Sequence, residues 1–304
     1  MDFKQLKYFL HVAELGSYTR AAEFLNVAQP VLSRQIRQLE IELRQNLLIR
    51  HGRGVKLTEA GGTLLHHSRI VLQQLERARE DLSLASGKIK GHAVLGMPPT
   101  ISRLLSVEII KKFREELPYA SLSISEGLTV NLQDNLLLGR NQLALLNNPT
   151  YSSEIQTRLL TSENLSLIAR SDDTDFEAGA PLTADRLARL PLIIPSAPNT
   201  FRLLLEREMA RLNQRPNIVL EIDSIETTLE LVLESMGYAI LSPRAVSLIH
   251  QKRDLKAVPL QSPVLTNRLF LGTSMKYAQT RLQSELIRIV GEICSAHFPH
   301  TTGV

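Results

Sequence analysis

The spacing of the apolar residues changes near residue 90, and this change separates two parts of the chain that must fold differently. Before it, apolar residues recur at helical spacing. After it, residues 92–304 alternate short apolar runs with helical stretches, which predicts α/β layers with largely parallel sheets. At about 150 residues per domain, a chain of 304 residues has room for two domains and a small third module.

Short apolar runs in the second part predict strands at 93–96, 122–125, 143–146, 165–169, 192–194, 218–222, 239–241 and 269–271. Helical spacing between them predicts helices at 101–116, 131–138, 200–212, 225–235, 243–250 and 279–297. This many alternating elements can form two lobes with a cleft between them.

Composition excludes several classes of protein. Hydrophobic residues make up 43% of the chain and charged residues 22%, which indicates a folded chain and not a disordered one. No apolar run exceeds four residues, whereas a membrane helix needs about 18, and the first residues lack the apolar core of a signal peptide. The single cysteine, Cys294, excludes an internal disulfide framework and a cysteine-based zinc cluster. We therefore expect a cytoplasmic protein.

The excess positive charge lies entirely in the first third of the chain. Residues 1–90 carry 14 Lys and Arg against 9 Asp and Glu, a balance of +5, whereas the remaining residues have a balance of −1. This asymmetry suggests a polyanionic partner for the N-terminal part.

Helical spacing predicts three helices in the first 58 residues, the second over 19–25 and the third over 29–44. Gly16 and Asn26 are residue types that end helices in the left-handed conformation, and Ser17 can cap the second helix. Two short helices with a tight turn, followed by a longer helix with a basic outer face, describe a helix-turn-helix.

Two glycines and two cations within residues 51–58 predict a hairpin that forms a β-wing, with a plain loop as the alternative. A long helix follows, and Thr58 can cap its start. Its seven-residue spacing predicts a dimerising linker helix, with packing on its own domain as the alternative. The residues that define this spacing are Leu64, Val71, Leu75, Ala78, Leu82 and Ala85.

The sequence offers no catalytic constellation. It has no phosphate-binding loop of the Walker type, no dinucleotide glycine fingerprint after a strand and no Gly-x-Ser-x-Gly motif. Among the eight histidines, none lies at metal-ligand spacing with a carboxylate. We therefore predict no enzyme activity, no catalytic residue, no metal site and no cofactor.

The third helix carries the side chains that DNA recognition needs. The N-terminal turns of such a helix enter the major groove, where Gln and Arg can contact base edges and Val31 can meet a thymine methyl group. Arg20 and Arg37 are better placed for phosphates, and Arg53 in the wing for a minor groove. The alternative for any one of them is a solvated helix face. The predicted DNA-contacting residues are Arg20, Gln29, Pro30, Val31, Ser33, Arg34, Arg37 and Arg53.

The first 62 residues resemble, without gaps, the signature of the LysR-type transcriptional regulators. The resemblance lies in residues 16–22 (GSYTRAA), 29–36 (QPVLSRQI) and 57–61 (LTEAG). Ala28 departs from it, because the family often has Ser there; this removes a helix cap worth about 1 kcal/mol. Leu48 stands where Phe is common, a harmless core exchange.

The resemblance continues more weakly through residues 139–146 (GRNQLALL), 190–194 (LPLII) and 236–243 (MGYAILSP), with Gln142 where the family has an acid. It is strongest to the subgroup that contains the nitrogen assimilation control regulator. It implies an N-terminal all-α winged helix-turn-helix, a long linker helix and a two-lobed α/β effector domain like the periplasmic binding proteins. It also implies dimers that assemble as tetramers on near-palindromic double-stranded promoter DNA, and we expect contact with RNA polymerase. The short apolar runs predict no membrane partner.

The expected boundaries follow from the elements and the resemblance together. The winged helix-turn-helix covers 1–58 and the linker helix 59–88. The effector domain covers 92–304, with lobe I at about 92–161 and 266–304 and lobe II at about 162–265.

Ligands of two-lobed folds bind beyond the carboxyl ends of strands, against helix N-termini, and two such N-termini facing one cleft favour an anion. The resemblance supports Thr100 and Ser196 most. The alternative for each residue is a capping or turn role alone. The predicted effector-binding residues are Pro99, Thr100, Thr129, Asn147, Ser196, Asn199, Thr200 and Arg202.

Three functions remain open from the sequence. The first is a DNA-binding transcriptional regulator that responds to a small, anionic effector in the cleft. The second is a regulator whose cleft is filled by side chains and needs no effector. The third is a small-molecule enzyme or binding protein without DNA function; the missing catalytic constellation argues against the enzyme.

Overall fold

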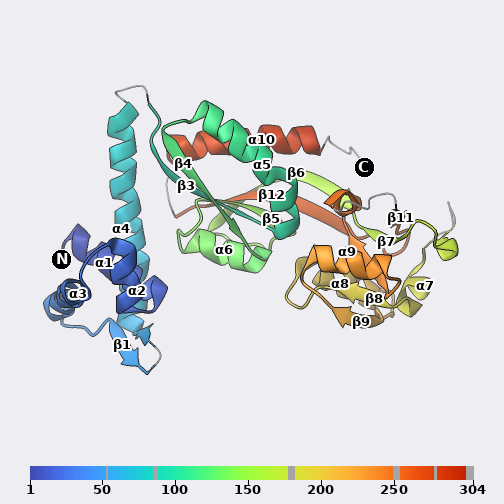
Figure 1. The fold of residues 1–304 in the computed structure, drawn as a ribbon, viewed down its shortest axis with the longest axis horizontal. Coiled ribbons are helices and arrows are strands. Elements are labelled where there is room, and N and C mark those ends of the chain that lie inside the picture. The colour runs from blue at the N-terminus through green and yellow to red at the C-terminus, as the bar shows by residue number, and fades with distance from the viewer. Residues whose placement is uncertain (53, 85–87, 177–181, 249–253, 277–278, 299–304) are drawn as a thin grey trace. The chain divides into compact units, whose positions relative to one another are not determined.

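The computed structural model describes residues 1–304 except 53, 85–87, 177–181, 249–253, 277–278 and 299–304 (Figure 1). It forms two compact units, Met1–Gly91 and His92–Val304, which we describe separately. In the described residues, no helix is both long enough and apolar enough to cross a membrane.

The described residues of the N-terminal unit form four helices and a two-stranded hairpin. Its core is formed by side chains from all three short helices, including Phe9, Ala21 and Leu32. The elements are α1 (Phe3–Leu15), α2 (Tyr18–Leu25), α3 (Gln29–Leu43), β1 (Leu48–His51), β2 (Gly54–Leu57) and α4 (Glu59–Leu84).

The predicted helix ends are confirmed. Gly16 ends α1 with a φ of 61°, and the Ser17 hydroxyl accepts a hydrogen bond from the Arg20 N–H at 3.3 Å at the start of α2. Asn26 ends α2 with a φ of 52°. At the start of α3, Ala28 provides no side-chain cap. These turns fix the angle between α2 and α3.

The predicted wing is also confirmed. Strands β1 and β2 pair antiparallel, from Leu48 opposite Leu57 to His51 opposite Gly54. The Thr58 hydroxyl then caps α4 by accepting from the Gly61 N–H at 2.9 Å. A Cβ atom at Gly61 would lie 2.0 Å from a main-chain oxygen of the loop before β1, so only glycine fits where α4 meets that loop.

The first turns of α4 pack on the helix-turn-helix. Leu65 belongs to the core of the unit, and Arg69 donates to Glu14 of α1 at 2.8 and 3.2 Å. Val71, in contrast, is 40% exposed, and Leu75 is half-buried. One side of α4 therefore packs on its own domain, which was the alternative to a dimerising helix. Some of the residues at seven-residue spacing nevertheless remain exposed or only half-buried. The side chains of Leu82 and Ala85 lie outside the described residues.

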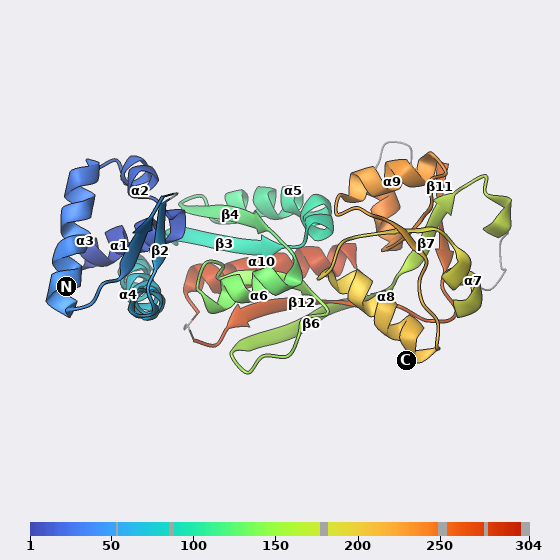
Figure 2. The same ribbon diagram turned by 90° about the horizontal axis from the view of Figure 1, so that it is seen from below.

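The first lobe of the C-terminal unit is built on a five-stranded sheet in the order β4-β3-β5-β12-β6. In Figure 1, α5 and α10 lie above this sheet and α6 below it, and α6 is nearer the viewer in Figure 2. The elements are β3 (Gly91–Met97), α5 (Pro99–Glu116), β4 (Ala120–Glu126), α6 (Thr129–Leu137), β5 (Leu143–Asn147), β6 (Ile155–Asn164), β12 (Thr266–Ser274) and α10 (Arg281–His297).

The second lobe is built on a five-stranded sheet in the order β11-β7-β10-β8-β9. Along β8, Leu192 and Ile194 join the core under α8, whereas Ile193 joins the core under α9, so helices cover both faces. The elements are β7 (Ser166–Arg170), the short 3₁₀ helix η1 (Thr174–Phe176), α7 (Ala184–Arg189), β8 (Leu192–Ile194), α8 (Thr200–Arg211), β9 (Ile218–Glu221), α9 (Ile225–Leu233), β10 (Tyr238–Leu241), the 3₁₀ helix η2 (Pro243–Leu248) and β11 (Leu255–Pro259).

The sheets are mixed, which corrects the expectation that they are largely parallel. Strands β3 and β5 pair parallel, as do β8 with β9 and with β10. Strand β12 pairs antiparallel with β5 and β6, and β7 with β10 and β11. The antiparallel pairs arise where the chain passes between the lobes, from β6 directly into β7 and from β11 back into β12.

Strands β6 and β11 and helix α7 were not predicted from the sequence. Most of β6 is exposed or half-buried, because the strand lies at the edge of its sheet, so it lacks the apolar run of a central strand. The predicted helix at 243–250 is a 3₁₀ helix over Pro243–Leu248, and its last two residues lie outside the described residues.

Candidate DNA-binding face and effector cavity

Helix α3 presents a polar face opposite its buried stripe. Leu32, Ile36 and Leu39 are fully buried, whereas Val31 is 45% exposed. The other predicted base-contacting side chains are exposed or half-buried: Gln29, Pro30, Ser33 and Arg34. The first turns of α3 therefore present their polar groups outward, the arrangement that a recognition helix needs.

The cations around α3 differ in their contacts. Arg20 donates to the Leu15 carbonyl at 2.5 Å and stays exposed, and Arg37 lies 3.5 Å from Glu40 on its own helix. Predicted residue Arg53 lies outside the described residues.

Sequence reasoning missed Arg50, which joins the wing to α3. Its guanidinium donates to the Ser33 hydroxyl at 3.3 Å and lies 5.1 Å from the centre of the Tyr18 ring. Arg50 therefore links β1 to both α2 and α3 and holds a cation beside the recognition helix. The sequence did contain a signal for this role, because Arg50 is a cation that lies two residues before the first glycine of the wing.

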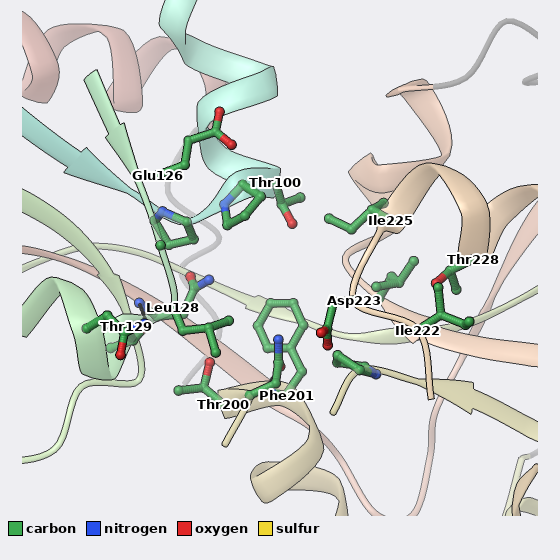
Figure 3. Close-up of a pocket in the computed structure, with 18 of the residues that line it drawn as sticks. Thr100, Glu126, Leu128, Thr129, Thr200, Phe201, Ile222, Asp223, Ile225 and Thr228 are labelled. Atoms are coloured by element: carbon green, nitrogen blue, oxygen red, sulfur yellow. Dashed lines mark hydrogen bonds between the residues drawn. The ribbon is translucent and has the colours of Figure 1, made fainter. Parts of the chain in front are cut away.

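The C-terminal unit contains a cavity of about 340 Å³ where the two lobes meet (Figure 3). Four helices begin at it: α5 and α6 from the first lobe, and α8 and α9 from the second. This is the position that the fold predicts, beyond the carboxyl ends of parallel strands.

Six of the eight predicted effector-binding residues line this cavity: Pro99, Thr100, Thr129, Asn147, Asn199 and Thr200. The other two do not. The main-chain N–H of Ser196 donates to the Asp223 carboxylate at 2.9 Å, so Ser196 positions a side chain that lines the cavity.

Arg202 is held away from the cavity by two acids. Its guanidinium lies 2.8 Å from Glu206 and 2.9 Å from Glu221, and these hydrogen bonds raise the pKa of Arg202. The charge that was predicted to attract an anion is therefore already neutralised within its own lobe.

Several polar groups of the cavity are fixed by hydrogen bonds. The Thr129 hydroxyl accepts from the Asn147 N–H at 3.1 Å, and the Asn147 side-chain oxygen accepts from Asn267 at 3.3 Å. The Asn199 side chain caps α8 by accepting from the Phe201 N–H at 2.9 Å. Asn199 therefore has the capping role that was the alternative to ligand binding.

Sequence reasoning missed the two carboxylates of the cavity, Glu126 and Asp223, and its apolar wall. Leu128, Phe201, Ile222 and Ile225 belong to that wall. No Lys, Arg or His lies among the described residues that line the cavity. The two acids lie at strand ends, one at the end of β4 and the other just after β9. This position is the sequence signal that could have identified them as cavity residues.

Gln142, where the family has an acid, plays a structural part. Its side-chain oxygen accepts from the Val94 N–H of β3 at 2.6 Å and so ties β3 to the start of β5.

The described residues contain no group of three or more His, Cys, Asp or Glu side chains that could hold a metal ion. Cys294 is buried on α10, and this burial raises the pKa of its thiol to about 12.

Two protein-family models match the chain. Residues 3–62 match the helix-turn-helix of bacterial regulatory proteins of the lysR family, and residues 86–295 match the LysR substrate-binding domain. Among characterised relatives, the nitrogen assimilation regulatory protein nac of Klebsiella aerogenes is 31% identical over 277 residues, which cover 91% of this chain and 90% of the relative. The nac protein of Escherichia coli strain K12 is 30% identical over 81% of this chain and 79% of its own.

Solved structures agree on the fold. A full-length OxyR variant from Pseudomonas aeruginosa superposes with a TM-score of 0.76 at 24% identity, over 97% of this chain and 95% of its own. Full-length CbnR, solved in complex with its target DNA, superposes with a TM-score of 0.66 at 22% identity, over 96% of this chain and all of its own. Since the two family models together match nearly the whole chain, the protein belongs to the LysR family and is a DNA-binding transcriptional regulator with an effector-binding domain.

Proposed function

We propose that this protein binds promoter DNA through α3 and the wing, and that a small molecule in the interlobe cavity sets its affinity for that DNA. The observation that carries the proposal is a cavity of about 340 Å³, bordered by helix starts from both lobes, in a chain with an outward-facing recognition helix. The cavity favours this function over a regulator whose cleft is filled by side chains.

The DNA contacts divide into two kinds. Gln29, Arg34 and Val31 read base edges in the major groove, with Pro30 and Ser33 beside them. Arg20 and Arg37 contact phosphates, which position the protein without specifying sequence, and Arg53 enters a minor groove. Support comes from the exposure of the described members of this set and from the likeness to CbnR, which was solved bound to its target DNA.

The linker helix joins two copies into a dimer, and dimers pair as tetramers. The exposed side chain of Val71 and the half-buried side chain of Leu75 on α4 support this role, because apolar residues at heptad spacing stabilise helix pairs. A palindromic promoter site would then match the two-fold symmetry of the dimer.

We place the protein in the cytoplasm. We propose RNA polymerase as a further partner, and we propose no catalytic function.

Effector control would act as a population shift. A ligand that touches both lobes binds one lobe arrangement better than another and so biases their equilibrium. The change reaches the DNA only if the two arrangements hold the helix-turn-helix units differently.

Fluorescence anisotropy tests the DNA-binding half of the proposal. The full chain is titrated onto the DNA upstream of its own gene and onto a scrambled duplex of equal length, at near-physiological salt. We expect tighter binding to the first duplex, since LysR-type regulators bind promoter DNA. Equal, salt-sensitive binding to both would leave only the electrostatic attraction and would contradict the proposal for this promoter.

A further inference from the structure

The charge inside the interlobe cavity does not suit a plain anion. Glu126 and Asp223 are its charged lining residues, and the described lining residues include no cation to balance them. A ligand that carries only negative charge would meet two carboxylates, both on exposed side chains, so solvent weakens the repulsion but no cation among the described lining residues offsets it. These charges favour a ligand that also carries a positive group.

The first lobe contributes two helix starts without side-chain caps, together with the Glu126 carboxylate. The N-cap residues of α5 and α6 are Pro98 and Leu128, and neither supplies a side-chain cap, so the first N–H groups of these helices receive no hydrogen bond from a capping side chain. Uncapped helix starts attract negative charge.

Thr100 provides an independent sign of a ligand on this side. Its side chain is only 9% exposed and lines the cavity, and Figure 3 shows it directed inward. Among the described residues, its hydroxyl has no hydrogen-bond partner. Because the side chain faces the cavity, its hydroxyl is available to donate a hydrogen bond to a ligand oxygen.

The second lobe offers the opposite chemistry. The side chains of Asn199 and Ser224 cap α8 and α9. Each of these helix starts therefore has a main-chain N–H that already donates to a side chain of the protein. Asp223 directly precedes Ser224 and lines the cavity, where Figure 3 labels it together with Phe201. One Asp223 oxygen accepts from the Ser196 N–H, which leaves the other free to accept a hydrogen bond from a cationic group.

We propose, on the basis of the effector site proposed above, that the cavity binds a small zwitterion of the α-amino acid class. Its carboxylate lies against the starts of α5 and α6 with the Thr100 hydroxyl, and its protonated amine pairs with Asp223. Its apolar part packs on Phe201, Ile222 and Ile225. Since carboxylate and amine are held by different lobes, this ligand would stabilise one arrangement of the two.

The test uses the full chain and matched probes. The common protein amino acids are compared, at millimolar concentration, with their counterparts that lack the amine and those that lack the carboxylate. Thermal stabilisation selects the best amino acid, and calorimetric titration then gives its Kd. We expect at least one amino acid to stabilise the protein, and both of its counterparts to bind about 10- to 100-fold more weakly, since each loses a charged hydrogen bond.

Variants then locate the amine. Asp223→Asn keeps an oxygen for the Ser196 N–H but loses the charge, so we expect the Kd for the amino acid to rise about 10- to 100-fold and the Kd for the amine-free counterpart to change little. Asp134→Asn, an exposed acid on α6 outside the cavity lining, is the matched control and should leave both Kd values unchanged.

Three results would overturn the inference: tighter binding of amine-free carboxylates than of amino acids, no stabilisation by any amine-bearing probe, or an unchanged Kd in Asp223→Asn. Tighter binding of amine-free carboxylates would still be consistent with an effector-binding regulator. Failure of the protein to distinguish its promoter from scrambled DNA is the separate result that removes the proposed function.

Discussion

Arg103 of α5 and Glu226 of α9 form an ion pair that joins the two lobes of the effector-binding unit. Both residues lie one turn or less from side chains that line the cavity, Thr100 on α5 and Ile225 on α9. The side chains of the pair are 42% and 49% exposed, so their attraction is screened by solvent and worth at most about 1 kcal/mol. The pair therefore favours the observed lobe arrangement without locking it.

Removal of this pair should weaken ligand binding slightly. In Arg103→Ala we expect the Kd of a cavity ligand to rise by about two- to fivefold, because the lobe arrangement seen here loses up to about 1 kcal/mol. Calorimetric titration measures the change. Arg207→Ala is the control, since Arg207 pairs with Glu208 on the same helix. A Kd identical to that of the unmodified protein would show that the pair does not influence the cavity.

Arg34 should carry sequence discrimination. We expect Arg34→Ala to narrow the difference in Kd between promoter and scrambled DNA, with about 1–3 kcal/mol lost if its contact with a guanine is bidentate. Arg37→Ala, as a phosphate contact, should weaken binding to both duplexes equally. Anisotropy titrations on the two duplexes separate these results. An equal loss on both duplexes in Arg34→Ala would make Arg34 a phosphate contact instead.

Leu75 should support the dimer. A charge placed at this half-buried position of α4 would have to be desolvated in a helix pair, so Leu75→Glu should shift the protein toward monomers. Light scattering measures the mass. Gln74→Glu, at an exposed neighbouring position, is the control and should keep the mass of the unmodified protein. If the mass of Leu75→Glu is also unchanged, α4 does not pair copies through this residue.

Cys294 should be unreactive in the folded protein. Its side chain is buried, and a thiol with a pKa of about 12 holds almost no reactive thiolate at neutral pH. We expect a thiol reagent to label the native protein far more slowly than the protein in denaturant, and labelling of the native protein to speed up as the pH rises. Rapid, stoichiometric labelling at neutral pH without denaturant would contradict the burial of this residue.

Much of the N-terminal unit could be predicted because its turns are set by single residues. The left-handed positions of Gly16 and Asn26 and the caps Ser17 and Thr58 act within a few residues of themselves, so the sequence carries the whole signal. The antiparallel wing followed from the same kind of local evidence.

The parts that sequence reasoning missed depend on distant partners. Strand β6 is stabilised by its pairing with β12, more than 100 residues later, and its own side chains are largely polar. Asp223 and Glu126 reach one cavity only because two lobes close around it. Arg202 was misplaced for a related reason: Glu206 lies one turn away in sequence, but Glu221 reaches it only through the fold.

The central claim is that occupancy of the cavity changes DNA affinity. The most direct test measures the Kd for promoter DNA with and without a saturating cavity ligand, found by thermal stabilisation, in the unmodified protein and in Thr100→Val. We predict a change of about 5- to 150-fold in the unmodified protein, the usual range of allosteric coupling, and little change in the variant because it no longer holds the ligand. An unchanged Kd for DNA while calorimetry shows the ligand bound would contradict the account.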